Sequence, residues 1–115
     1  MTPPRPGQPA GPAEPDQVLA AMADPTRRRL LDVLAADGPA TASTLAEGVP
    51  ISRQAVAKHL AVLRRAGLVS SSKQGRDVRF AIRTGGLSQT ADWLAGLAAE
   101  WDDRLAAIKQ IAEGS

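Results

Sequence analysis

Cysteine is absent from this 115-residue chain, and aromatic residues are limited to one Phe and two Trp. Without a thiol, the chain cannot form disulfides, thiolate metal sites or a cysteine nucleophile. Because aromatic rings are so few, the core must be filled by Leu, Val, Ile and Ala, a composition that favours packed helices. The length leaves room for one domain with one modest core.

Long apolar runs and catalytic patterns are also absent. No stretch approaches the roughly 20 apolar residues that cross a bilayer, and no signal-peptide pattern opens the chain, so we expect a cytoplasmic protein with no membrane partner. There is no nucleophile with its base, no paired carboxylates placed for a cleft and no phosphate-binding glycine loop, since Gly85 and Gly86 lack the spacing of a nucleotide fingerprint. We therefore expect neither catalytic residues nor a cofactor.

Positive charge is concentrated in the middle of the chain. The formal net charge is only +2, but residues 50–83 carry eight Lys and Arg against one acid, Asp77. The segments 1–49 and 84–115 are both net acidic. This imbalance is typical of a protein that binds a polyanion, although a solvated basic face would give the same count, so the pattern of the chain has to decide.

The chain divides into a tail and a helical domain. Residues 1–15 hold six of the nine prolines and are expected to be a disordered, dispensable tail. The folded domain is predicted over residues 16–112, followed by a short C-terminal end, residues 113–115. Capping signals predict four helices in its first half. The predicted helices are 16–23, 25–36 with Asp24 as its cap, 42–47 with Thr41 as its cap, and 53–66, which Ser52 caps and Gly67 ends.

The third and fourth predicted helices are joined by a tight turn at Gly48, which is the helix-turn-helix arrangement. In "ISRQAVAKHLAVLRRAGLV" (51–69), the apolar residues Val56, Leu60 and Leu63 share one face. The opposite face carries Arg, Gln, Ala and Lys: Arg53, Gln54, Ala57, Lys58 and Ala61. Arg can donate twice to a guanine edge, Gln can pair with adenine, and Ala allows close approach to base pairs. Lys58, Arg64 and Arg65 are suited to phosphate contacts.

Residues 68–82, "LVSSSKQGRDVRFAI", predict a two-stranded hairpin with a basic tip. Val78, Phe80 and Ile82 are expected to face inward, alternating with outward Asp77, Arg79 and Ala81. A hairpin directly after a recognition helix is the wing of a winged helix domain, and Lys73, Arg76 and Arg79 could reach a DNA backbone or minor groove. The alternative is that these charges only protect an exposed strand edge from pairing with other chains.

Three segments together resemble the ArsR/SmtB family of bacterial winged helix transcriptional regulators: "MADPTRRRLLDVL" (22–34), 51–69 and "GRDVRFAI" (75–82). The resemblance covers roughly residues 16–112. It implies a homodimer that binds a palindromic operator on double-stranded DNA and represses transcription, often from its own promoter. The positions that match the family's base-contacting residues are Ser52, Arg53, Gln54, Ala57, Lys58 and His59. Since relatives often have Gln or Ser where Arg53 and Ala57 stand, the operator should differ.

The chain departs from the metal-sensing members of that family. Those members bind metal through Cys near the third helix, or through Asp and His on the last helix. The matching segment here, "TASTLAEG" (41–48), has no thiolate or imidazole, the last helix has no His, and its carboxylates alone make poor zinc, nickel or copper sites. His59, the single histidine, lies in the recognition helix, where we expect it either to pack against the domain or to touch DNA. We therefore expect a metal-independent member with no metal site, and its effector is unknown.

A last helix is predicted over 87–111, longer than so small a domain can cover by itself. Its apolar residues recur every three or four positions, so part of this stripe should meet another subunit together with the first helix, as in the family. The alternative is a purely intramolecular core. The residues expected at the dimer interface are Val18, Leu19, Met22, Leu94, Leu97, Trp101, Leu105 and Ile108.

The predicted fold is thus mainly α with a small β-hairpin: a winged helix-turn-helix of five helices plus a wing, dimerising through its first and last helices. The predicted function is sequence-specific DNA binding by a homodimeric transcriptional repressor. The alternative is a winged helix that serves as a protein-interaction module without specific DNA binding. Arg53 and Gln54 argue against that alternative, because an interaction face would more often present exposed apolar anchors.

Overall fold

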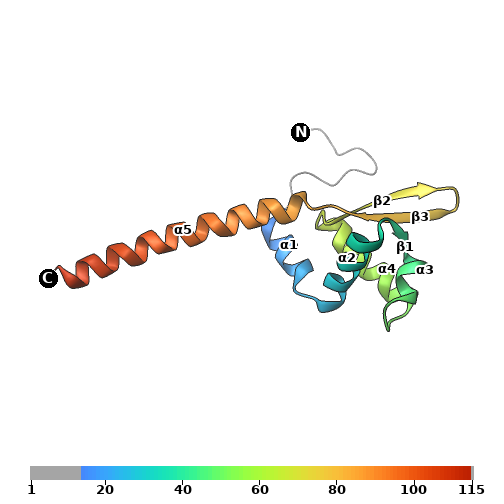
Figure 1. Cartoon of the computed structure of the whole chain (residues 1–115), viewed down its shortest axis with the longest axis horizontal. Coiled ribbons are helices and arrows are strands. Elements are labelled where there is room, and N and C mark those ends of the chain that lie inside the picture. Colours follow the sequence, from blue (N-terminus) through green and yellow to red (C-terminus); the bar gives the residue numbers. More distant parts are fainter. Residues whose placement is uncertain (1–13, 115) are drawn as a thin grey trace.

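A computed structural model of the chain describes residues 14–114 (Figure 1). Its elements in chain order are α1 (Pro15–Met22), α2 (Pro25–Asp37), β1 (Ala40–Thr41), α3 (Ala42–Glu47), α4 (Arg53–Arg65), β2 (Val69–Gln74), β3 (Asp77–Ile82) and α5 (Gly85–Glu113). Most of the predicted tail, residues 1–13, and Ser115 lie outside the described residues. Pro15, which we had assigned to the tail, opens α1, since Pro is well tolerated at the first helical position.

The predicted helix caps are confirmed. The side-chain oxygens of Asp24, Thr41 and Ser52 each accept a hydrogen bond from the backbone N–H three residues later, all at 3.1 Å. At the end of α4, Gly67 has φ of 78°, a left-handed conformation that suits glycine. There the Leu68 N–H donates to the Leu63 carbonyl at 2.9 Å and that of Gly67 to the Arg64 carbonyl at 3.0 Å. This pair of bonds is a Schellman motif, which turns the chain sharply out of α4 into β2.

The sheet has three antiparallel strands in the order β1-β3-β2, one more than the predicted hairpin. The extra strand, β1, pairs Ala40 with Phe80 and Thr41 with Arg79. We missed it because a two-residue strand has no alternation to detect. Val78, expected to face inward, is 43% exposed, because the outer part of the hairpin extends beyond the helices (Figure 1). Phe80 and Ile82 are half-buried against the core, as expected.

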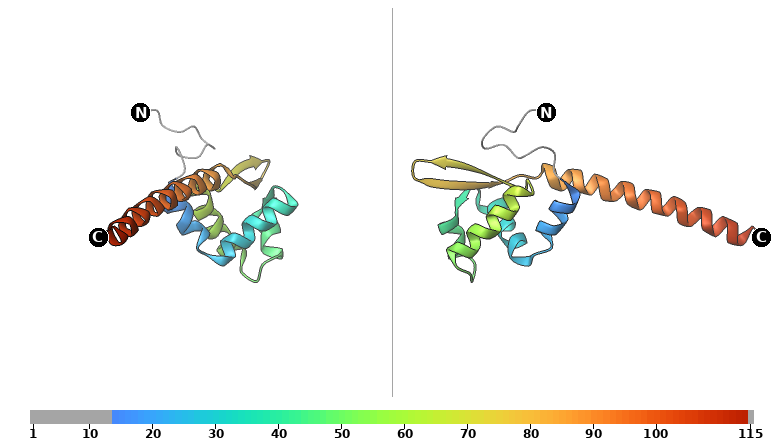
Figure 2. Two further views of the ribbon diagram at one scale, coloured as in Figure 1. Left: turned by 60° about the vertical axis from the view of Figure 1, so that its left-hand side comes forward. Right: turned by 180° about the vertical axis from the view of Figure 1, so that it is seen from behind.

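The core lies among α1, α2, α3, α4 and the start of β2. Its fully buried side chains are aliphatic, as the scarcity of aromatic residues predicted: Val18, Leu30, Leu34, Leu45, Val56, Leu60, Leu63 and Leu68. The helix α5 takes little part in this core. Its first turns pack on α1, burying Gly86 and Thr90, and the rest projects away from the domain (Figures 1 and 2). Within residues 14–114, no helix is long and apolar enough to span a membrane.

Candidate nucleic-acid interface

The recognition helix α4 has one buried and one exposed face. Val56, Leu60 and Leu63 are completely buried against α2 and α3. Because these three residues recur at helical spacing, they fix which residues face outward. Arg53, Gln54, Ala57 and Lys58 are all exposed, so the structure brings the predicted base-contacting side chains to one surface at the N-terminal half of α4.

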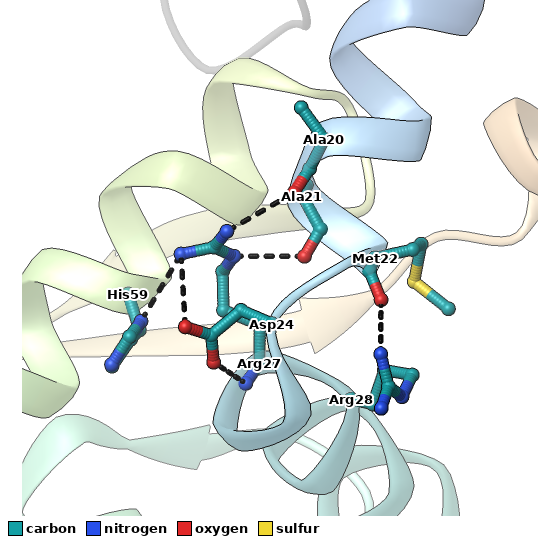
Figure 3. A network of polar contacts seen from close by, with 7 residues as sticks. All are labelled: Ala20, Ala21, Met22, Asp24, Arg27, Arg28 and His59. Carbon is teal, nitrogen blue, oxygen red and sulfur yellow. Dashed lines mark hydrogen bonds and ion pairs between the residues drawn. The ribbon is translucent and has the colours of Figure 1, made fainter.

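Ser52 and His59 flank that surface and have partners within the chain. The Ser52 hydroxyl oxygen accepts the N–H of Ala55 as the helix cap, and a hydroxyl can donate outward at the same time. His59 is half-buried on the flank of α4 that faces α2, with its Nδ1 3.4 Å from Nη1 of Arg27 (Figure 3). We expected His59 either to pack against the domain or to contact DNA. The structure supports packing for the side of the ring that carries Nδ1, because Arg27 occupies it.

Sequence reasoning missed the polar network that holds His59. Its centre is Arg27, the last residue of the "DPTR" segment, whose Asp we had interpreted only as a helix cap. The Asp24 carboxylate accepts the Arg27 backbone N–H at 3.1 Å and lies 3.8 Å from the Arg27 guanidinium. That N–H, followed by the guanidinium charge, holds the pKa of Asp24 below its ordinary value. The carboxylate therefore stays ionised at neutral and mildly acidic pH.

The predicted backbone-contacting residues are all exposed. Arg64 and Arg65 stand in the last turn of α4, and Lys73, Arg76 and Arg79 lie along the β2–β3 wing. The turn of the wing at Gly75 has φ of 64°, which glycine adopts without strain. In Figure 1, α4 and the wing lie at one end of the molecule and the C-terminus of α5 at the other. The C-terminal part of α5 therefore covers neither of the two cationic elements.

The predicted dimer surface needs one correction. Val18 is only 1% exposed, because it packs into the core of its own chain, so its side chain cannot form part of an intersubunit surface. Met22 and Leu97 are half-buried. The other predicted residues are exposed: Leu19, Leu94, Trp101, Leu105 and Ile108. Trp93 and Ile111 are exposed as well. The helix α5 is also longer than predicted, with 29 residues from Gly85 to Glu113.

Potential metal ligands are not clustered. Among residues 14–114, no three His, Asp or Glu side chains lie close enough together to hold a metal ion. The acidic residues of α5 are spread along the helix, and Glu100 is engaged by Arg104 at 2.6 Å.

Comparisons with known proteins agree with this geometry. A family model described as a helix-turn-helix domain matches residues 22–71. An ArsR-like transcriptional regulator from Rhodococcus sp. RHA1 is 48% identical, with 85% of this chain and 92% of that chain covered, and its structure superposes with a TM-score of 0.77. The transcriptional repressor SdpR of Bacillus subtilis is 31% identical over 90 residues, which are 78% of this chain and 99% of that protein.

A shorter match joins the chain to the HTH-type transcriptional regulator CmtR of Mycobacterium tuberculosis, with 44% identity over about half of each protein. The fold and the exposed basic surface define a winged helix-turn-helix DNA-binding protein that regulates transcription. The nearly full-length matches then identify its family. The chain belongs to the ArsR/SmtB family of transcriptional regulators, whose members named here are regulators and not enzymes.

Proposed function

We propose that this chain is a homodimeric repressor that binds a palindromic operator, with its own promoter as the first target to test. The observation that carries the proposal is the division of α4: its apolar residues are completely buried, while Arg53 and Gln54 are exposed in its first turn. A helix-turn-helix places that end of the second helix against base edges in the major groove. The repressor role is supported by the name of the B. subtilis relative.

In this proposal the exposed residues of α4 and the wing divide into two groups. Arg53 donates to guanine and Gln54 pairs with adenine, while Ala57 leaves room for close approach. Ser52, Lys58 and His59 border this group. The second group contacts phosphates and gives affinity without sequence preference: Arg64, Arg65, Lys73, Arg76 and Arg79. All members of the second group are exposed cations.

The dimer is proposed from the apolar surface that α5 leaves uncovered. Trp101, Leu105 and Ile108 are each more than half exposed on one side of that helix, next to exposed Leu94. Pairing α5 and the exposed Leu19 of α1 with a second copy would remove this surface from water. Two-fold symmetry would also present two recognition helices, which bind successive major grooves when they are about 34 to 36 Å apart. Residues 16–112 are the proposed functional unit.

We further propose that this regulator acts in the bacterial cytoplasm, where the chromosome lies, and that a bound metal is not its signal. The residues at the family's metal positions carry no thiolate or imidazole. Carboxylates alone bind zinc, nickel and copper weakly.

The test is fluorescence anisotropy with two duplexes, the chain's own upstream DNA and a scrambled duplex of the same length, over a series of salt concentrations. Specific recognition predicts binding at least about a hundredfold tighter to the upstream DNA, with log affinity falling linearly against log salt. The variant Arg53→Ala/Gln54→Ala should lose this preference. The control Arg104→Ala removes the same charge from the far half of α5, so it should keep the preference.

The alternative, a protein-interaction module, predicts a different result. Both duplexes would then bind weakly and equally, and Arg53→Ala/Gln54→Ala would bind like the wild type. Equal binding would first exclude regulation of its own promoter. A genome-wide search that also recovered no sites would then favour the module.

A further inference from the structure

The Arg27 side chain joins three helices of the domain (Figure 3). Its Nε donates to the carbonyl of Ala21 at 2.8 Å and its Nη2 to that of Ala20 at 3.1 Å, both at the end of α1. Its own backbone lies in the first turn of α2. Its Nη1 lies 3.4 Å from Nδ1 of His59 in α4. With its side chain only 17% exposed, Arg27 is largely withdrawn from solvent.

The chemistry of this contact fixes its direction. A guanidinium has N–H donors and no acceptor. Arg27 therefore donates and the Nδ1 atom of His59 accepts. The carbonyls of Ala20 and Ala21 belong to the last turn of α1, where few helical N–H groups remain to bond them. The Ala20 carbonyl also accepts the Ala23 N–H at 3.3 Å. One side chain thus bonds two carbonyls at the end of α1 and contacts the flank of α4.

We propose that Arg27 is a positioning residue for DNA recognition: it fastens the end of α1 to the recognition helix through His59 and thereby sets the orientation of α4 against DNA. Buried Val56, Leu60 and Leu63 hold α4 on the core, but apolar packing is not directional. The hydrogen bond from Arg27 to His59 is directional. It acts on α4 one residue from Lys58 and two residues from Ala57. The inference rests on the proposed base-contacting role of α4.

The experiment uses the full chain and a duplex that the wild type selects from a random-sequence pool. Affinities are measured for the wild type, Arg27→Gln, His59→Leu and the double variant. Arg28→Gln is the matched control, because Arg28 is a neighbouring arginine of α2 that bonds the end of α1 through Met22 at 2.6 Å and is exposed. Each single variant should lose on the order of tenfold in affinity, as expected for a hydrogen bond to a charged group.

The expected pattern is non-additive: the double variant binds no more weakly than the weaker single variant, and Arg28→Gln binds like the wild type. Additive losses, or equal losses for Arg27→Gln and Arg28→Gln, would each overturn the positioning role. If circular dichroism shows that Arg27→Gln is unfolded, Arg27→Lys replaces it in the same cycle. A pool without an enriched sequence counts against specific DNA binding itself, whereas enrichment with additive losses counts against Arg27 alone.

Discussion

The helices α4 and α5 both carry an apolar stripe, but only α4 buries its stripe within the chain. Leu60 in α4 is fully buried, whereas Leu105 in α5 is 63% exposed and Trp101 is 56% exposed. The polar residues differ as well. The exposed face of α4 is cationic, and the described part of α5 holds more acids than bases.

The difference separates two kinds of amphipathic helix. A stripe that is buried internally leaves the opposite face of the helix free for contacts, so in α4 the exposed charges are the proposed DNA-contacting surface. A stripe that stays exposed is itself a candidate contact surface, because large exposed apolar patches are unfavourable in water. In α5 the apolar residues are therefore the proposed contact surface.

The largest effect is expected from a charge in the exposed stripe. Leu105→Asp should convert the proposed dimer to a monomer. Each Leu that is buried at the interface contributes about 1.5 to 3 kcal/mol to association, and in a two-fold dimer the substitution removes one Leu from each subunit. The dimer should weaken by about a hundredfold or more. Sedimentation velocity over a concentration series would measure this. Ala99→Asp places the same charge on the opposite side of α5 and should leave association intact; equal dissociation by both variants would contradict the stripe as the interface.

The second-largest effect is a difference in how much the apolar stripes of α4 and α5 contribute to the free energy of unfolding. In the Leu105→Asp background, where association does not enter, Leu60→Ala should lower the free energy of unfolding by about 2 to 5 kcal/mol, because it leaves a cavity in the core. Ile108→Ala should change it by no more than about 0.5 kcal/mol, because Ile108 is largely exposed. Urea unfolding followed by circular dichroism measures both. A comparable loss from Ile108→Ala would mean that α5 already packs within its own chain.

A smaller effect is expected at the start of the recognition helix. Ser52→Ala removes the acceptor for the Ala55 N–H and should cost about 1 kcal/mol of stability. Ser52→Asp keeps an acceptor and should retain most of it, while its negative charge near the DNA surface should weaken DNA binding. Thermal unfolding and anisotropy together separate the two roles. If Ser52→Ala loses no stability, the cap adds nothing to α4.

Short-range signals predicted most of the fold. The caps at Asp24, Thr41 and Ser52 and the glycine at 67 fixed helix boundaries to within about a residue, because capping depends on nearby atoms. The strand β1 escaped prediction, because two residues are too few to show an alternation. The exposure of Val78 escaped prediction as well, because it depends on how far the helices extend beneath the wing. The exposed face of α4 followed from helical period alone, whereas the burial of Val18 and the Arg27–His59 contact required the packing of α1 and α2 against α4.

The smallest predicted effect concerns the side of α5 opposite the stripe. Gly96 lies there, and an added Cβ would meet no heavy atom within 4 Å. In an exposed helix interior, replacing Gly by Ala stabilises by up to about 1 kcal/mol, because Gly loses the most backbone freedom on folding. Gly96→Ala should therefore raise the melting temperature without changing the dimer dissociation constant. A variant that melts higher but dissociates more readily would place the partner subunit over Gly96, and the interface would then lie on the other side of α5 from Leu105.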